Sequence, residues 1–145
     1  LMDSTLIIDY LEALAGPGCS LMPVSIDQRL RALRLIGLGL AASEKSVQLF
    51  FFNDSAPTEI QFQPWVERVE GQLAAAYSAL ERELEKQPLK TDGSIDQAGI
   101  TLAVAWSFTN LVVPDQVDAA QFPQIIAFTA YAEGLEAFVS IPIDG

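Results

Sequence analysis

The stretch Ser94–Trp106, SIDQAGITLAVAW, decides the fold of this chain. Asp96 is a predicted helix N-cap, because its carboxylate can accept a hydrogen bond from a backbone N–H group of the first turn. The residues after it are small or apolar, so other helices can approach closely. We therefore expect Gln97 to Asn110 to form the central core helix, with one side made of Ile100, Ala103, Val104 and Ser107 or Phe108.

A long helix is predicted upstream of this segment, starting at Ser25. Ser25 and Gln28 have the spacing of a capping box. Apolar residues then occupy two sides of the helix: Leu30, Leu33, Ile36, Gly37, Leu40 and Ala41 on one, and Leu35 and Leu38 on another. Such a helix must be covered on two sides. We expect the bundle to cover one side and another domain or a second subunit to cover the other.

A second long helix is predicted after a polar turn at 53–58, with Pro64 in its first turn. Its apolar face consists of Val66, Val69, Leu73, Ala76, Leu80 and Leu84, and the residues placed outside that face are Glu67, Arg68, Glu81, Arg82 and Glu83. The segment 87–93 ends it. Phe122-Pro123 opens a later helix that ends near Gly134, and 135–138 adds one more turn. Because nothing alternates like a strand, we predict an all-α bundle of five to seven helices.

The first segment, LMDSTLIIDYLEAL, also has a helical pattern, with Ser4 as the expected N-cap. One face carries Leu6, Ile7, Tyr10, Leu11 and Leu14. The segment 16–24 contains two glycines and two prolines and is typical of a linker. A helix that precedes a linker in this way has no sheet in the chain to pack against. We therefore expect a further domain upstream.

Composition narrows the function classes. The net charge of −11 repels phosphate backbones and anionic membrane surfaces, so neither nucleic acid nor a membrane is an expected partner. The densest apolar stretch, 33–42, is interrupted by Arg34 and two glycines and is too short to span a bilayer. The acidic first segment does not resemble a secretory leader, which makes a cytoplasmic location the expectation.

Ionisable side chains set further limits on the chemistry. The chain has no histidine, which removes the usual catalytic triads and most zinc sites, so we expect no metal. The three arginines Arg29, Arg31 and Arg34 form the one basic cluster, and we expect them to pair with acids of neighbouring helices. Aromatic side chains at 50–52, 65, 77, 106 and 108 are expected to pack in the core, although some could line an apolar pocket. Tyr10 and Tyr77 have no neighbouring base and are also predicted to pack.

The order of these pieces resembles the glutathione transferase family. DSTLIIDYLEAL is similar to the last helix of the family's thioredoxin-like N-terminal domain, and SIDQAGITLAVAW is similar to the start of the core helix of its helical C-terminal domain. QFPQIIAFTAYAEGLEAF resembles a later helix of that domain. The family pattern usually has Ser or Thr as the cap of this helix, where this chain has Asp96, and Asp three residues later. Gly99 stands there and costs about 1 kcal/mol of helix propensity relative to alanine, which indicates a local constraint on the first turn.

The resemblance implies a domain division and a function. Residues 1–15 would be the last helix of a truncated thioredoxin-like domain, 16–24 the linker, and 25–145 an all-helical domain of the glutathione transferase C-terminal type. The implied activity joins the thiol of glutathione to a small hydrophobic electrophile, with this chain providing the electrophile pocket and the surface of a homodimer. Asp3 and Ser4 would hold the γ-glutamyl end of glutathione, while the thiol-activating residue would lie upstream, so no catalytic residue is named.

Two other interpretations remain open at this point. The chain could be a non-catalytic helical domain of the same fold that serves protein assembly, as in the transferase-like domains of translation factors and synthetases. It could also be an unrelated acidic helical bundle. Ser4 could be an ordinary N-cap with no ligand, which would be worth about 1 kcal/mol.

Overall fold

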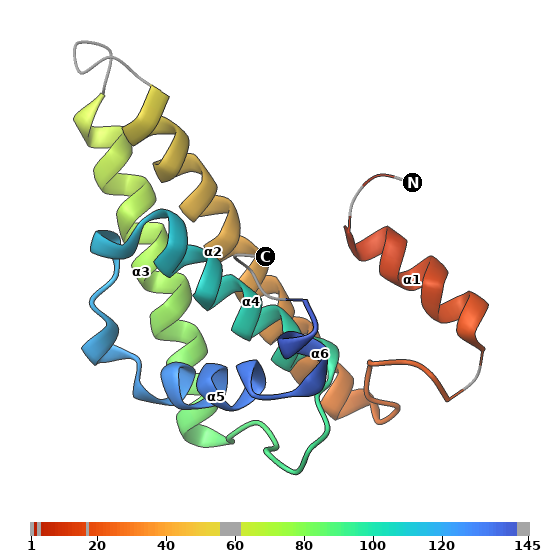
Figure 1. Ribbon diagram of the computed structural model, residues 1–145. Helices are drawn as coiled ribbons and strands as arrows, with labels where there is room; N and C mark the ends of the chain where they lie inside the picture. The colour runs from red at the N-terminus through yellow and green to blue at the C-terminus, as the bar shows by residue number, and fades with distance from the viewer. Residues whose placement is uncertain (1, 3, 17, 56–61, 142–145) are drawn as a thin grey trace.

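The long apolar segments of the sequence are all helical in the structure, a computed structural model that describes residues 2, 4–16, 18–55 and 62–141, with the side chains of residues 4 and 53–55 left undescribed (Figure 1). Within these residues there are six α-helices, two 3₁₀ helices and no strand, which confirms the all-α prediction. The elements are α1 (Ser4–Ala15), α2 (Ile26–Ser55), α3 (Gln63–Lys86), α4 (Gln97–Val112), η2 (Pro114–Gln116), η3 (Ala119–Gln121), α5 (Pro123–Glu133) and α6 (Glu136–Val139).

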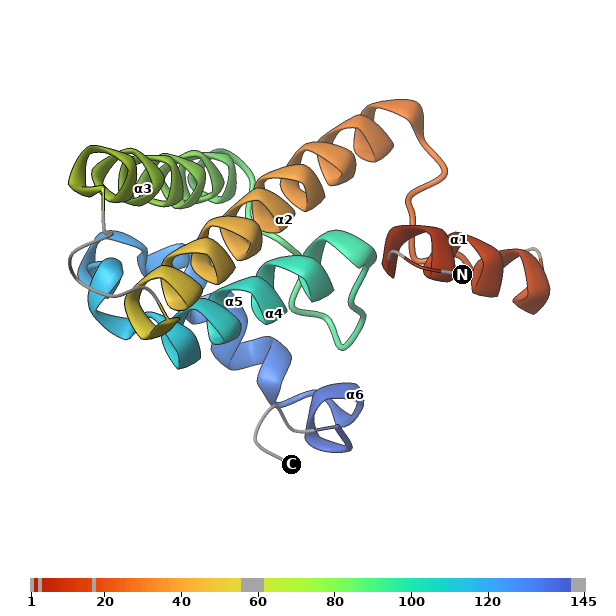
Figure 2. The ribbon, with the colours of Figure 1, turned by 90° about the horizontal axis from the view of Figure 1, so that it is seen from above.

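Helix α4 lies at the centre of the bundle and contacts both α2 and α5 (Figures 1 and 2). Asp96 caps it as predicted, because its Oδ1 accepts a hydrogen bond from the Gly99 N–H at 2.9 Å. A Cβ atom at Gly99 would lie 2.8 Å from Phe128 Cζ and 2.9 Å from Ile95 Cγ1. The glycine therefore permits the ring of Phe128 on α5 to pack against the first turn of α4, which is the local constraint that the sequence indicated.

The predicted core side of α4 was largely wrong. Val104 is 49% exposed, and of the predicted side only Ala103 is buried. The buried residues of α4 are Ala98, Gly99, Leu102, Ala103, Ala105, Trp106 and Thr109. Because apolar and small residues surround the whole helix, spacing alone could not select the face that α2 and α5 cover.

Helices α2 and α3 pack side by side as an antiparallel pair (Figure 1). All six predicted apolar positions of α3 are buried, and Pro64 lies in its first turn as expected. Helix α2 extends to Ser55, into the segment predicted as a turn, whose remaining residues 56–58 lie outside the described residues. Arg34 on α2 forms an ion pair with Glu83 on α3 at 3.5 Å, which confirms for this arginine the expected pairing with a neighbouring helix.

Glu81 was expected on the outside of α3 and is instead 5% exposed. Its two carboxylate oxygens accept hydrogen bonds from the N–H groups of Gln124 at 2.8 Å and Ile125 at 3.1 Å, in the first turn of α5. The N-cap residue of α5, Phe122, has no side-chain cap of its own. Glu81 therefore supplies that cap from another helix, where a negative charge is also favoured by the helix dipole.

Three buried hydroxyl groups join α2, α3 and α4. The hydroxyl oxygen of Thr109 lies 2.6 Å from that of Tyr77 and 2.7 Å from that of Ser46. Tyr77 also donates to the carbonyl oxygen of Ala105, and Ser46 donates to that of Ala42, each at 3.0 Å. Burial raises the pKa of Tyr77 to about 12, because the phenolate would lose its hydration. The predicted packing role of Tyr77 is therefore confirmed.

Candidate functional site

Helix α1 stands apart from the bundle (Figures 1 and 2), and its large apolar side chains are exposed. The predicted packing of Tyr10 is not found, since Tyr10 is 53% exposed, and the other exposed apolar residues of this helix are Leu6, Ile7, Leu11 and Leu14. The helix begins at Ser4, but Asp3 and the side chain of Ser4 lie outside the described part of the chain. The contact of Asp3 and Ser4 with glutathione therefore stays a prediction.

Glu12 connects α1 to the linker through hydrogen bonds. Its carboxylate accepts hydrogen bonds from the hydroxyl of Ser20 and the N–H of Leu21, both at 2.7 Å. The Leu21 carbonyl in turn accepts a hydrogen bond from the N–H of Gln97, at the start of α4, at 3.1 Å. The two hydrogen bonds that the Glu12 carboxylate accepts lower its pKa below the usual value, and the bond from the Ser20 hydroxyl is the largest cause. A continuous set of hydrogen bonds thus connects α1 with the central helix.

Helix α2 has two apolar faces, as predicted. Its inner face is buried against α3 and α4 and consists of Ala32, Leu35, Gly39, Ala42, Ser46 and Leu49. Its outer face is exposed and carries Ile26, Leu30, Leu33, Leu40, Val47 and Phe51. The inner positions repeat at alternating intervals of three and four residues, and the outer positions repeat at intervals of three, four or seven, which places each set along one side of the helix. Within the described residues, nothing covers the outer face.

The apolar stretch 33–42 is too short to span a bilayer, as judged from the sequence, but α2 as a whole is long enough. By length and composition alone, Ile26–Phe52 could cross a membrane, because an 18-residue stretch within it has a mean hydropathy of 1.3, and 28% of that stretch is buried. The helix nevertheless packs along α3 and α4, as a core helix of a bundle does. Its high hydropathy follows from having a second apolar face in addition to the face in the core.

The aromatic residues divide into two groups. Tyr77 and Trp106 are buried and pack edge to face with ring centroids 5.0 Å apart, which confirms the packing prediction for them. Phe51 is 60% exposed and Phe50 is 38% exposed, near the end of α2. The exposed group is therefore the part of the aromatic set that could contact a partner or an apolar ligand.

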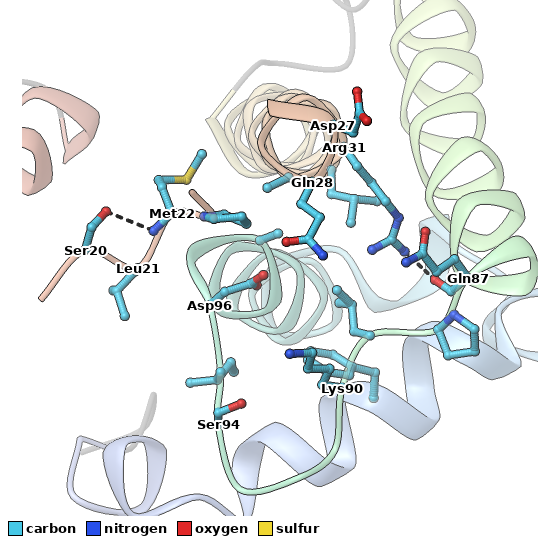
Figure 3. Close-up of a pocket in the computed structure, with 18 residues that line it drawn as sticks. Ser20, Leu21, Met22, Asp27, Gln28, Arg31, Gln87, Lys90, Ser94 and Asp96 are labelled. Atoms are coloured by element: carbon cyan, nitrogen blue, oxygen red, sulfur yellow. Dashed lines mark hydrogen bonds between the residues drawn. The ribbon is translucent and has the colours of Figure 1, made fainter. Parts of the chain in front are cut away.

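A cavity of about 490 Å³ lies where the linker, the start of α2 and the loop between α3 and α4 meet (Figure 3). It combines polar side chains, including Gln28, Arg31 and Lys90, with apolar ones. No residue of α1 lines it, so it is separate from the predicted glutathione contacts. Among the described residues, no group of three or more histidine, cysteine or acidic side chains could hold a metal ion.

Comparison with solved structures identifies the fold. Two structures of a glutathione transferase family member from Pseudomonas fluorescens match 97% of this chain at 24% identity. One has S-(propanoic acid)-glutathione bound, with a TM-score of 0.83 and 70% of its own chain covered, and the other has glutathione bound, with a TM-score of 0.84 and 66% covered. A glutathione S-transferase from Methylobacterium radiotolerans, in complex with glutathione sulfonate, matches 97% of the chain at 20% identity and a TM-score of 0.83, with 65% covered.

The resemblance drawn from the sequence is confirmed at the level of the fold, which is that of glutathione transferase family members with an all-helical C-terminal domain. The chain spans about two thirds of the length of these structures. No protein-family model matches it, and no curated protein matches it.

Proposed function

We propose that this chain is the helical part of a glutathione transferase-like protein that joins the thiol of glutathione to a small hydrophobic electrophile. The observation that carries the proposal is the structural match over 97% of the chain to proteins with glutathione or its derivatives bound. Helix α1 accounts for 12 of 145 residues, more than the uncovered 3%, so most of it belongs to the matched part.

In this proposal α1 is the last helix of a thioredoxin-like domain whose remaining residues lie upstream. Its exposed apolar face would pack against the sheet of that domain. Asp3 and Ser4 would hold the γ-glutamyl end of glutathione, because the N–H groups at a helix N-terminus and a serine hydroxyl suit a carboxylate, while an aspartate suits the ammonium group. The thiol-activating residue would come from the upstream domain.

The outer face of α2 is the proposed dimer surface. A helix of 30 residues is about 45 Å long and about 10 Å wide, so one face presents about 450 Å². A stable interface buries about 800 Å² on each partner. The outer face therefore provides roughly half of what a dimer needs, and we expect the upstream domain to provide the rest. The exposed Phe50, which is not part of this face, is a candidate for contact with the electrophile.

The test compares this chain with a longer form that includes the thioredoxin-like domain. We expect no glutathione conjugation by this chain above the uncatalysed rate, and conjugation of a model electrophile by the longer form. In the longer form, Ser4→Ala should weaken glutathione binding roughly tenfold or more, as measured by isothermal titration, since it removes a hydrogen bond to a charged group. Asp9→Asn, further along the same helix, is the control.

Two results would change the proposal. If the longer form bound no glutathione but still assembled with itself or another protein, the non-catalytic assembly domain would be the better interpretation. If Ser4→Ala and the unchanged longer form bound glutathione equally well, Ser4 would be a helix cap only.

Light scattering measures the dimer independently, and a Leu33→Glu substitution on the outer face should shift the longer form towards a monomer.

A further inference from the structure

Helix α1 is placed beside the bundle without extensive helix packing. Among the described residues, the extensive contacts between helices join α2, α3, α4, α5, α6 and the 3₁₀ helices, and α1 takes part in none of them. Figure 2 shows α1 beside the bundle and joined to it by the linker. If the linker 16–24 were a free flexible chain, its ends would lie about 15–18 Å apart on average, with no fixed direction. The placement of α1 therefore depends on bonds made by the linker.

A single linker residue, Leu21, bridges α1 and α4. Its N–H donates a hydrogen bond to the Glu12 carboxylate on α1 at 2.7 Å. Its carbonyl accepts a hydrogen bond from the N–H of Gln97, the first residue of α4, at 3.1 Å. The N–H groups in the first turn of a helix have no partner inside that helix, so this carbonyl satisfies one of them. The backbone of Leu21 thus connects α1 directly to the start of the central helix.

The residues on either side of Leu21 hold this bridge in place. The hydroxyl of Ser20 donates to the second oxygen of the Glu12 carboxylate at 2.7 Å and accepts a hydrogen bond from the N–H of Met22 at 3.1 Å (Figure 3). The side chain of Met22 packs against the hydrophobic core of the bundle. The linker is therefore anchored to the bundle by a backbone hydrogen bond and an apolar side chain, and Glu12 joins α1 to this anchored segment through both of its carboxylate oxygens.

We propose that Glu12 is a positioning residue that fixes the orientation of α1, and with it the helix N-terminus at Ser4, relative to the bundle. Ser4 lies about 12 Å along the helix from Glu12, so a tilt of about 10° at Glu12 would move Ser4 by about 2 Å. Reacting atoms must lie about 3–3.5 Å apart, and a misplacement of about 1 Å can cost about a hundredfold in rate. The consequence for catalysis rests on the proposed conjugation activity, whereas the orientation of α1 does not.

The orientation is tested in this chain by pulsed electron paramagnetic resonance. Spin labels are attached to α1 at Ala13→Cys and to α3 at Glu85→Cys, two exposed positions, in a chain that also carries Cys19→Ser. We expect a narrow distribution of distances between the labels, and Glu12→Ala should broaden it. Alanine favours a helix at least as well as glutamate, so α1 should stay helical, which circular dichroism checks. Asp9→Ala removes an equal charge from α1 and should leave the distribution narrow.

Two further variants assign the effect to the hydrogen bonds of Glu12. Ser20→Ala removes one donor from the linker and should also broaden the distribution. The double variant of Glu12→Ala and Ser20→Ala should be no broader than Glu12→Ala alone, because the two residues share one hydrogen bond. Glu12→Gln keeps the size of the side chain but not its charge, and its distribution should lie between those of Glu12→Ala and the unchanged chain.

The consequence for catalysis is measured in the longer form that includes the thioredoxin-like domain. With a slowly reacting electrophile, Glu12→Ala should lower kcat by about tenfold, through loss of alignment between the two reactants. The dissociation constant of glutathione should stay unchanged, because the proposed glutathione contacts lie at the other end of α1. Glu12→Gln should restore part of kcat, and Asp9→Ala should leave it unchanged.

The proposal would be overturned by an unchanged distance distribution in Glu12→Ala, or by equal broadening in Asp9→Ala. A broadened distribution with unchanged kcat would overturn the positioning role. A loss of glutathione affinity as large as the loss of kcat would also overturn it, because it would indicate damage to the binding site itself. If the longer form conjugated no electrophile, the proposed function would fail, and the distance measurements would still decide whether Glu12 orients α1.

Discussion

The two faces of α2 have similar residues at the same spacing and opposite environments. Leu35 on the inner face is fully buried, whereas Leu33 on the outer face is 53% exposed. The inner face meets α3 and α4, and the outer face meets no other described element. The difference shows that apolar spacing predicts how many faces of a helix are buried in the intact protein. It does not predict which element packs against each face. It also identifies pairs of matched positions at which inside and outside can be compared.

The largest expected effect is on Leu35. Leu35→Ala should lower the free energy of unfolding by about 2–5 kcal/mol, because it leaves a cavity in a packed core. Leu33→Ala should change it by less than about 0.5 kcal/mol in this chain. Urea denaturation of both variants at low protein concentration gives the comparison. Equal losses would mean that the outer face is covered in solution.

On α3 the matched pair is Glu81 and Glu85. Glu81→Gln should destabilise the chain by about 1.5–3 kcal/mol, because one carboxylate oxygen that accepts an N–H of α5 is replaced by an amide donor. Glu85 is exposed, and Glu85→Gln should have little effect. Amide hydrogen exchange at Gln124 and Ile125 should accelerate in the first variant only. Unchanged exchange would rule out the capping role.

Tyr77 and Tyr10 extend the comparison to hydroxyl groups. Tyr77→Phe should cost about 0.5–1.5 kcal/mol at neutral pH, through loss of its hydrogen bonds to Thr109 and Ala105, while Tyr10→Phe should cost almost nothing. The pKa of Tyr77 is raised in the folded chain from 10 to about 12, so its stabilising contribution is complete below pH 10 and is lost as pH rises towards 12.

The pH dependence separates Tyr77 from the other alkaline transitions. Stability measured by denaturation between pH 9 and 12 should fall less steeply in Tyr77→Phe than in the unchanged chain. Tyr10→Phe should follow the unchanged chain. A Tyr77→Phe profile identical to that of the unchanged chain would contradict the buried environment of this phenol.

The smallest effect concerns the connection between α1 and the bundle. Since the pKa of Glu12 is lowered in the folded chain, its contribution is present above the usual carboxylate pKa and is lost as pH falls through the folded value. Proteolytic cleavage within the linker should therefore accelerate at acid pH. The linker of the Glu12→Gln variant should be cleaved faster than that of the unchanged chain at neutral pH, and its cleavage rate should depend less on pH. Asp9→Asn is the control on the same helix.

The fold was predictable wherever a segment had one apolar face. The six apolar positions of α3 and the Asp96 cap of α4 were predicted, because both depend on residues three or four apart in the same helix. The core side of α4 was not predictable, because its apolar residues surround the helix. For the site, the sequence named Asp3 and Ser4, which lie outside the described residues or side chains, and it did not indicate the cavity at Arg31 and Lys90.

The sequence by itself determined the helices, the Asp96 cap of α4 and the two apolar faces of α2, since each depends on local spacing, capping chemistry and the hydrophobic effect. Only the tertiary structure decided which face of α2 is covered, that Glu81 lies inside, and that the linker and two distant segments enclose one cavity. Glu81 and the N-terminus of α5 are more than 40 residues apart in the chain. Partnership across such a separation depends on how helices pack, which no local pattern encodes.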